Sequence, residues 1–232
     1  GLPPERVFLA RSGVDLSRFD HVAPADLRTE FDLQGVEVVL VMVANYRQQK
    51  DQPTVFRALA ALAPELRERL AVVTIGSTTS EPKFFDRCWA MATELGVTEH
   101  IRVAGARPDA LQLLAGADAG LLASKNETGP LVVLEYMASG LPFIVTDTGE
   151  ITRAIRDLPI GFTPAPRDPT ELAAAMAALL DLGPDERRAM GRRGRAVAEE
   201  VFDQQLVTRQ IEQVYHRLLT TQRGRPVAAV PP

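Results

Sequence analysis

The sequence predicts an α/β fold: a doubly wound, Rossmann-like parallel sheet followed by a helical C-terminal flank. Short β-branched apolar runs alternate with segments of helical periodicity between about residues 7 and 165, which is typical of βαβ units. The first run, residues 36–44, is almost continuously apolar, as expected for a strand buried on both faces. After residue 165 the pattern is helical only.

The expected elements follow one another in regular order. Strands are expected at residues 36–44, 71–75, 101–104, 119–123 and 143–146, with a last edge strand at 160–162. Helices are expected between them at residues 52–62, 81–95, 110–115, 131–139 and 151–155, and after them at 169–181, 184–200 and 204–220. Gly96 and Gly140 stand where helices favour a C-terminal glycine, and Pro130 stands in a first turn. We therefore expect one domain over residues 1–220 and a flexible tail over 221–232.

Composition excludes several classes of protein. The chain has 232 residues, of which 46% are hydrophobic and 24% charged, so it can fold around its own core. Its one cysteine, Cys88, rules out an intrachain disulfide framework and favours a reducing compartment, so we expect a cytoplasmic protein. The net charge of -4 argues against nucleic-acid binding, and no apolar run reaches the length of a membrane span.

In open parallel sheets, ligands bind beyond the carboxyl ends of the strands. The corresponding loops here are residues 45–51, 76–81, 105–109, 124–129 and 147–150. Arg47 and Lys50 in the first loop can neutralise a diphosphate, and Asn45 can donate to a phosphate or a sugar. Taken singly, each of the two cations is better explained as a solvated loop charge. The alternative for Asn45 is a residue that forms a turn.

The loop before residue 131 carries the strongest local signal. A helix that begins near Pro130 points free amide groups and its positive dipole end into the cleft, and Gly129 leaves room for a phosphate. Glu127 and Glu135 are eight positions apart, close to two helical turns, so both carboxylates can face the same cleft. The alternative is two solvated surface charges, but Glu135 stands in an otherwise apolar helix, where a carboxylate needs a partner or a ligand.

Other chemistries lack their motifs. The sequence contains no G-x-G-x-x-G after the first strand, no P-loop, no H-E-x-x-H, no Cys/His metal cluster and no G-x-S-x-G elbow. It also has no D-x-D pair at a strand end for a metal–diphosphate site. His21, His100 and His216 fall outside the candidate loops, which disfavours imidazole base catalysis. We therefore expect no metal site.

Residues 127–142, ETGPLVVLEYMASGLP, resemble the E-x7-E signature of the retaining family-four glycosyltransferases, which have a two-domain GT-B fold. Further matches occur in the family's order. They are the Ser12–Asp15 segment SGVD with Phe19, Lys50, Gly76, the segment IRVAG at 101–105, and TDTG at 146–149. The resemblance covers residues 7–205 and corresponds to the family's C-terminal, donor-binding domain.

The resemblance implies a role for each matching residue. Glu127 would contact the donor sugar and Glu135 the ribose hydroxyls. Lys50 and Arg47 would stabilise the leaving diphosphate, an electrostatic catalysis without a metal or cofactor. The donor would be a UDP- or GDP-linked sugar. Its remaining contacts would come from Asn45, Gly76, Arg107, Thr128, Gly129, Pro130, Leu131 and Val132.

The sequence departs from the family at three places. Asn45 stands where the family has an arginine, Thr128 to Pro130 replace its G-F/L-P, and Ser77 to Thr79 replace its second glycine. The family's N-terminal acceptor-binding domain has no counterpart in this sequence. We therefore expect that domain, or a separate subunit, as a partner; peripheral membrane association through it stays open.

Two alternatives to a complete catalytic half remain. The chain can be a nucleotide-sugar-binding module that transfers nothing without a separate acceptor-binding domain. It can also be a fragment of a GT-B nucleotide-sugar epimerase, although the absence of a histidine from the predicted cleft weighs against this.

Overall fold

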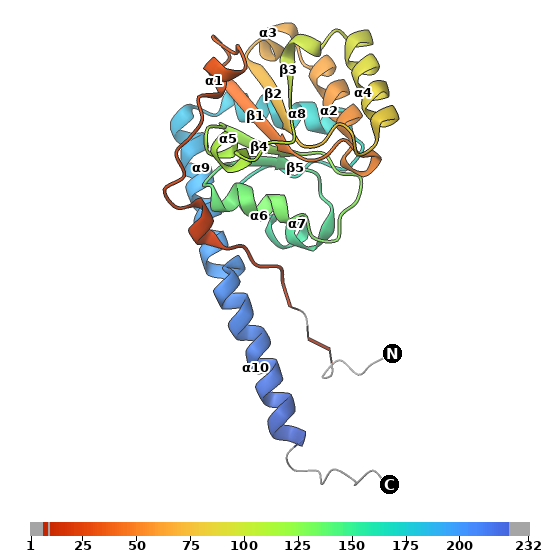
Figure 1. Ribbon diagram of the computed structural model, residues 1–232. Coiled ribbons are helices and arrows are strands. Elements are labelled where there is room, and N and C mark those ends of the chain that lie inside the picture. The colour runs from red at the N-terminus through yellow and green to blue at the C-terminus, as the bar shows by residue number, and fades with distance from the viewer. Residues whose placement is uncertain (1–6, 9, 223–232) are drawn as a thin grey trace.

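The computed structural model describes residues 7–8 and 10–222, and it confirms the predicted fold class. Its sheet has five parallel strands in the order β3-β2-β1-β4-β5 (Figure 1). The strands are β1 (Val38–Val43), β2 (Leu70–Ile75), β3 (Ile101–Gly105), β4 (Ala119–Leu122) and β5 (Phe143–Val145). Each of the five lies within one residue of a predicted strand or inside it. The order reverses beside β1, which makes the space beyond β1 and β4 a topological switch point.

The centre of the sheet forms the core. β1 and β2 pair in register from Val38 opposite Leu70 to Val43 opposite Ile75. Residues 38–42 and all of β2 are buried, so helices cover both faces of these strands. This explains why the two strands are read from sequence as continuous apolar runs rather than as alternating ones.

All eight predicted helices are present. Between the strands lie α2 (Gln52–Ala61), α4 (Pro82–Glu94), α5 (Ala110–Ala115), α6 (Leu131–Ala138) and α7 (Gly149–Ile155). The flank contains α8 (Pro169–Asp181), α9 (Pro184–Val197) and α10 (Gln204–Gln222). α2 packs against α4 and α8, and α6 packs against α7 and α9. Among the described residues, no helix combines the length and the apolar character needed to span a membrane.

A buried tyrosine anchors α6 to the sheet. The hydroxyl of Tyr136 donates to the carbonyl oxygen of Leu121 at 2.8 Å and lies 3.3 Å from that of Val41, so it links β4 and β1. Its ring lies over Gly120, where an added Cβ would come within 2.3 Å of the ring. A glycine in β4 therefore lets α6 approach the sheet closely.

The predicted edge strand at residues 160–162 is wrong. Phe162 forms only one parallel bridge, with Ile144, through hydrogen bonds of 2.8 and 2.9 Å to the Phe143 oxygen and the Val145 amide. The structure also contains short helices that the sequence did not predict. They are η2 (Leu16–Phe19), α1 (Leu27–Glu30), η3 (Gln48–Lys50), α3 (Pro64–Arg67) and η4 (Thr98–His100).

The C-terminal flank changes direction after α9. The predicted helix at 184–200 ends as α9 at Val197 and continues as a π-helical turn, η5 (Ala198–Phe202). Val14 pairs with this turn, since its amide donates to the Phe202 oxygen at 2.8 Å and its own oxygen accepts from Gln204 at 3.0 Å. α10 then projects away from the body (Figure 1). It extends through Gln222, two residues into the predicted tail, and residues 223–232 lie outside the described residues.

Candidate functional site

The loops at the carboxyl edge of the sheet bring Lys50 and Glu127 together. Lys50 ends η3, which follows β1, and Glu127 lies between β4 and α6. The Lys50 Nζ donates to Glu127 Oε1 at 2.6 Å. Both residues were predicted for one site from their strand-end loops and from the family resemblance, and the structure joins them directly across the switch point.

The Glu127 carboxylate has further donors besides Lys50. The hydroxyl of Ser124, which is fully buried, donates to the same Oε1 at 2.7 Å. The Gln49 amide donates to the backbone oxygen of Asn126 at 2.8 Å, and it lies 3.4 Å from Glu127 Oε2. The side chain of Glu127 is 10% exposed and that of Lys50 25% exposed. Glu127 is therefore held as an oriented carboxylate at the mouth of the site.

The Glu127–Pro130 loop rests on the start of α7. The amide of Glu150 donates to the Thr128 oxygen at 2.8 Å. Gly149 has a φ of +83°, and a Cβ there would come within 2.9 Å of Pro130 and 3.2 Å of the Glu127 Cβ. Gly129 differs: a Cβ there would meet nothing closer than 3.6 Å. The start of α7 therefore fixes the path of the loop, while a side chain at Gly129 would make only ordinary van der Waals contacts.

Asn45 and Gly76 shape the neighbouring part of the edge. The Asn45 Oδ1 accepts from the Ser77 amide at 2.8 Å, so this oxygen holds the loop after β2. Gly76 approaches β1 so closely that a Cβ would lie 2.3 Å from the oxygen of Ala44. The predicted strand-end glycine is thus required for close backbone packing, and the Asn45 side chain contributes first to loop structure.

The two candidate arginines have different surroundings. Arg47 is exposed at the start of η3, where its backbone oxygen accepts from the Lys50 amide at 2.9 Å. Arg107 follows β3 and is held by ion pairs of 2.7 Å to Asp109 and to Glu30. These carboxylates raise the pKa of Arg107 further above its usual range. Arg47 is free to swing toward a ligand, whereas Arg107 must give up or share a carboxylate to do so.

Glu135 lies in surroundings separate from those of Glu127. It faces a pocket of about 150 Å³ formed where α6 meets η2 and the start of α10. Burial raises the pKa of its carboxyl, and the charge of Arg18 across the pocket opposes this shift. The helical spacing did not bring the two carboxylates into one contact, because α6 begins only at Leu131, with Pro130 as its N-cap. Leu131 is exposed and Val132 half-buried at that first turn.

Three residues of the site were missed in the sequence. Ser124 and Gln49 hold Glu127, and Arg18 is the cation opposite Glu135. Ser124 and Gln49 belong to loops that were already candidates, so their position was a usable signal. Arg18 gave no such signal, since it approaches α6 only because η2 packs there.

The chain matches the family model described as "Glycosyl transferases group 1" over residues 26–197. It is 31% identical over 194 residues to a D-inositol 3-phosphate glycosyltransferase of Thermobispora bispora, covering 81% of this chain and 45% of that protein. It is 30% identical over 195 residues to an N-acetyl-alpha-D-glucosaminyl L-malate synthase of Bacillus anthracis, covering 83% and 49%. The chain therefore spans about half the length of these curated relatives.

Solved structures share the fold. A glycosyltransferase of Rickettsia africae superposes with a TM-score of 0.84 at 20% identity, covering 94% of this chain and 59% of that one. The Anabaena protein HepE, solved in complex with UDP and glucose, gives a TM-score of 0.80 at 21% identity, covering 93% and 58%. Together with the family match, which includes Lys50, Glu127 and Glu135, these likenesses lead to one conclusion: the chain belongs to the group 1 glycosyltransferases and has the fold of a GT-B domain.

Proposed function

We propose that this chain supplies the donor site of a glycosyl transfer that retains the anomeric configuration, with a nucleotide-diphosphate sugar as donor. The observation that carries the proposal is the 2.6 Å contact between Lys50 Nζ and Glu127 Oε1. It sets a cation suited to a diphosphate beside a carboxylate suited to sugar hydroxyls, at the switch point of a parallel sheet. Retention is proposed because the Glu127–Glu135 segment resembles that of retaining enzymes.

In this proposal each group has one task. Lys50 and Arg47 stabilise the negative charge that develops on the departing diphosphate, and the backbone around Gly129, Leu131 and Val132 binds the phosphates. Glu127 orients the sugar. Glu135 binds the ribose hydroxyls, and Arg107 lines the position of the base. No metal ion is needed for these steps, because the cations belong to the chain.

The test exploits the fact that Lys50 and Glu127 neutralise each other. UDP and GDP are titrated by calorimetry into the chain and its variants. Lys50→Met is expected to weaken binding by about tenfold or more, the value of one charged hydrogen bond. Glu127→Gln releases Lys50 and is expected to bind the sugar-free nucleotide at least as tightly as the parent chain. Glu135→Ala is expected to weaken binding.

Arg57→Met, an exposed change on α2, is the matched control and is expected to leave binding unchanged. Absence of binding to both nucleotides, or an equal loss in the Lys50 and Arg57 variants, would contradict the proposal. Retention is tested separately by the anomeric configuration of the product.

A second proposal concerns completeness: the chain transfers sugar only with an acceptor-binding partner. It is supported by the 45% and 49% coverage of the curated relatives. It is also supported by α10, on which Tyr215, Leu218 and Leu219 are all more than half exposed, as expected for a helix that packs on another domain. Transfer by the chain alone, without any added domain, would contradict it.

A further inference from the structure

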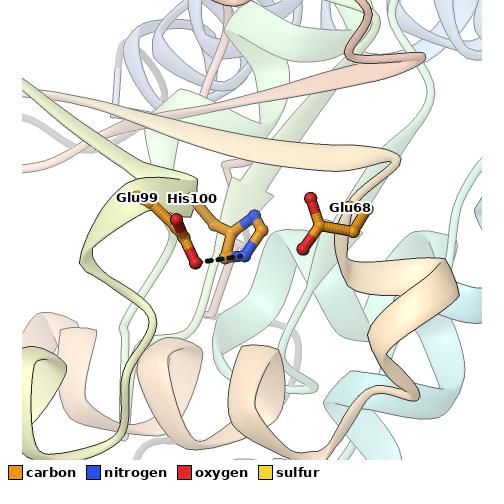
Figure 2. Close-up of side chains that lie close together, drawn as sticks. All are labelled: Glu68, Glu99 and His100. Carbon is orange, nitrogen blue, oxygen red and sulfur yellow. Dashed lines mark ion pairs between the residues drawn. The ribbon is translucent and has the colours of Figure 1, made fainter.

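Three potential metal ligands meet at the edge of the sheet opposite to Lys50 and Glu127 (Figure 2). Glu68 stands at the end of α3, just before β2, and Glu99 and His100 belong to η4, just before β3. Since the strands are parallel, residues that precede them gather at the amino edge. A strand of five or six residues separates the two edges by roughly 15–20 Å. The cluster is therefore distinct from the proposed donor site.

The three side chains of the cluster lie near one another but are not hydrogen-bonded to one another. One ligand atom from each side chain lies within 4.8 Å of the others. The His100 Nε2 is 3.7 Å from Glu99 Oε1, too far for a hydrogen bond. Figure 2 shows the imidazole ring between the two carboxylates, with Glu99 on one side and Glu68 on the other.

His100 gives the cluster its strongest argument. Its side chain is only 7% exposed, and its Nε2 is buried without a hydrogen-bond partner among the described residues. Leaving a buried polar atom unpaired is costly, so native proteins rarely do so without a ligand, water or ion. Here two carboxylates flank the imidazole ring, yet neither lies within hydrogen-bonding distance of the Nε2 atom.

The two carboxylates are also uncommitted. Among the described residues, neither Glu68 nor Glu99 forms an ion pair with an arginine or lysine. Arg102 lines the same pocket, which has a volume of about 340 Å³, but its guanidinium donates to backbone oxygens. Those oxygens belong to Phe31, Asp32, Glu99 and Ile101, at 2.7–3.3 Å. The negative charge of the cluster thus stays available to a cation.

We propose that Glu68, Glu99 and His100 bind a divalent transition-metal ion, with Zn²⁺ as the best match to one imidazole and two carboxylates. Ligand atoms about 2.1 Å from a tetrahedral Zn²⁺ are about 3.4 Å from one another, with water in the fourth position. The ligand atoms, which lie within 4.8 Å of one another, must therefore approach by up to about 1.4 Å, which the exposed side chains of Glu68 and Glu99 permit. The ion links the end of α3 to η4, at the amino ends of the neighbouring strands β2 and β3. Its role is structural.

The experiment uses the full chain freed of metal by a chelator. Zn²⁺ is titrated by calorimetry, and Co²⁺ is added in parallel to report coordination through its visible absorption. We expect one equivalent of Zn²⁺ to bind and to raise Tm, because an ion that binds only the folded state stabilises it. Cys88 does not compete, since burial raises the pKa of its thiol to about 12.

Glu68→Gln and Glu99→Gln are the main variants, because both side chains are exposed and the chain should fold without them. Each is expected to weaken Zn²⁺ binding about tenfold or more and to abolish the rise in Tm; His100→Gln should do the same. His21→Gln, a change to an exposed histidine elsewhere, is the control and should bind as the parent does. The proposal is overturned if Zn²⁺ leaves the Tm of the parent unchanged. It is also overturned if the Glu68 and His100 variants bind Zn²⁺ as tightly as the control.

Discussion

The two edges of the sheet differ in whether their charged side chains are paired. At the carboxyl edge, Lys50 and Glu127 are paired at 2.6 Å, and Ser124 donates to the same oxygen. At the amino edge, Glu68 has no ion-pair partner among the described residues, and the Nε2 of His100 is buried without a hydrogen bond to any of them. Both edges are built by the same parallel strands. Topology therefore decides which side chains meet at an edge, and local loop structure decides whether they form hydrogen-bonded pairs.

Two glycines with positive φ, one from each edge, differ in the space available for a side chain. Gly76 has no room for a Cβ, which would lie 2.3 Å from the oxygen of Ala44, whereas a Cβ at Gly35 meets nothing within 4 Å. Gly76→Ala is expected to lower the free energy of unfolding by about 3 kcal/mol or more, and Gly35→Ala by about 1 kcal/mol. Urea unfolding measures both. Equal losses would mean that the carboxyl edge is not the more tightly packed one.

Substitution of Lys50 tests the ion pair at the carboxyl edge. Lys50→Met leaves the nearly buried Glu127 with Ser124 and Gln49 as donors, and is expected to cost about 2 kcal/mol of stability. Adding Glu127→Gln removes the unpaired charge, so the double variant is expected to recover part of this loss. A double-mutant cycle on the two residues gives their coupling. Strictly additive losses would mean that the two side chains are not energetically coupled.

The Tyr136 hydroxyl provides a reference between the edges, since it bonds to β1 and β4 in mid-sheet. Tyr136→Phe is expected to lower the free energy of unfolding by about 1 kcal/mol, the net value of a buried hydrogen bond. Thermal unfolding measures it, and nucleotide affinity is expected to stay unchanged. If the variant lost more free energy of nucleotide binding than of unfolding, the binding site would have to include residues beneath α6.

The smallest effect concerns Glu135 and depends on pH. Burial raises the pKa of its carboxyl in the folded chain above the ordinary 4.5. The unfolded chain then releases this proton first, so Glu135 lowers stability as the pH rises above about 4.5. Glu135→Gln is therefore expected to have a higher Tm than the parent at pH 7, and this advantage shrinks toward pH 4. Calorimetry over this range checks it; a difference that does not change with pH would point to packing instead.

The strands were predictable because β1 and β2 are buried on both faces and leave continuous apolar runs in the sequence. The short helices η3, α3 and η4 were not, since helices of three or four residues depend on tertiary contacts rather than on a periodic pattern. The edge strand expected at 160–162 failed for a related reason. Two apolar side chains separated by a glycine do not determine strand pairing, and here only a single bridge forms, between Phe162 and Ile144.

The sequence was sufficient to predict which loops form the candidate site. It was not sufficient to predict which side chains within those loops make contact. The parallel direction of the strands assigns Lys50 and Glu127 to one edge, but the 2.6 Å contact depends on the path of both loops. The eight-residue interval from Glu127 to Glu135 is not an interval along one helix, because residues 127–130 precede α6. That both carboxylates face one cleft stays a prediction. The amino-edge cluster left a simple signal, since Glu68 and His100 each closely precede a predicted strand.

The seating of the Glu127–Pro130 loop has a consequence for redesign. Its path is fixed by the Glu150 amide on the Thr128 oxygen and by the missing side chain of Gly149, both of which are backbone features. Substitutions at Thr128 therefore leave the scaffold of the loop intact while changing the surface presented beside Glu127. Changes at Gly149, by contrast, would move the whole loop, because an added Cβ would lie 2.9 Å from Pro130.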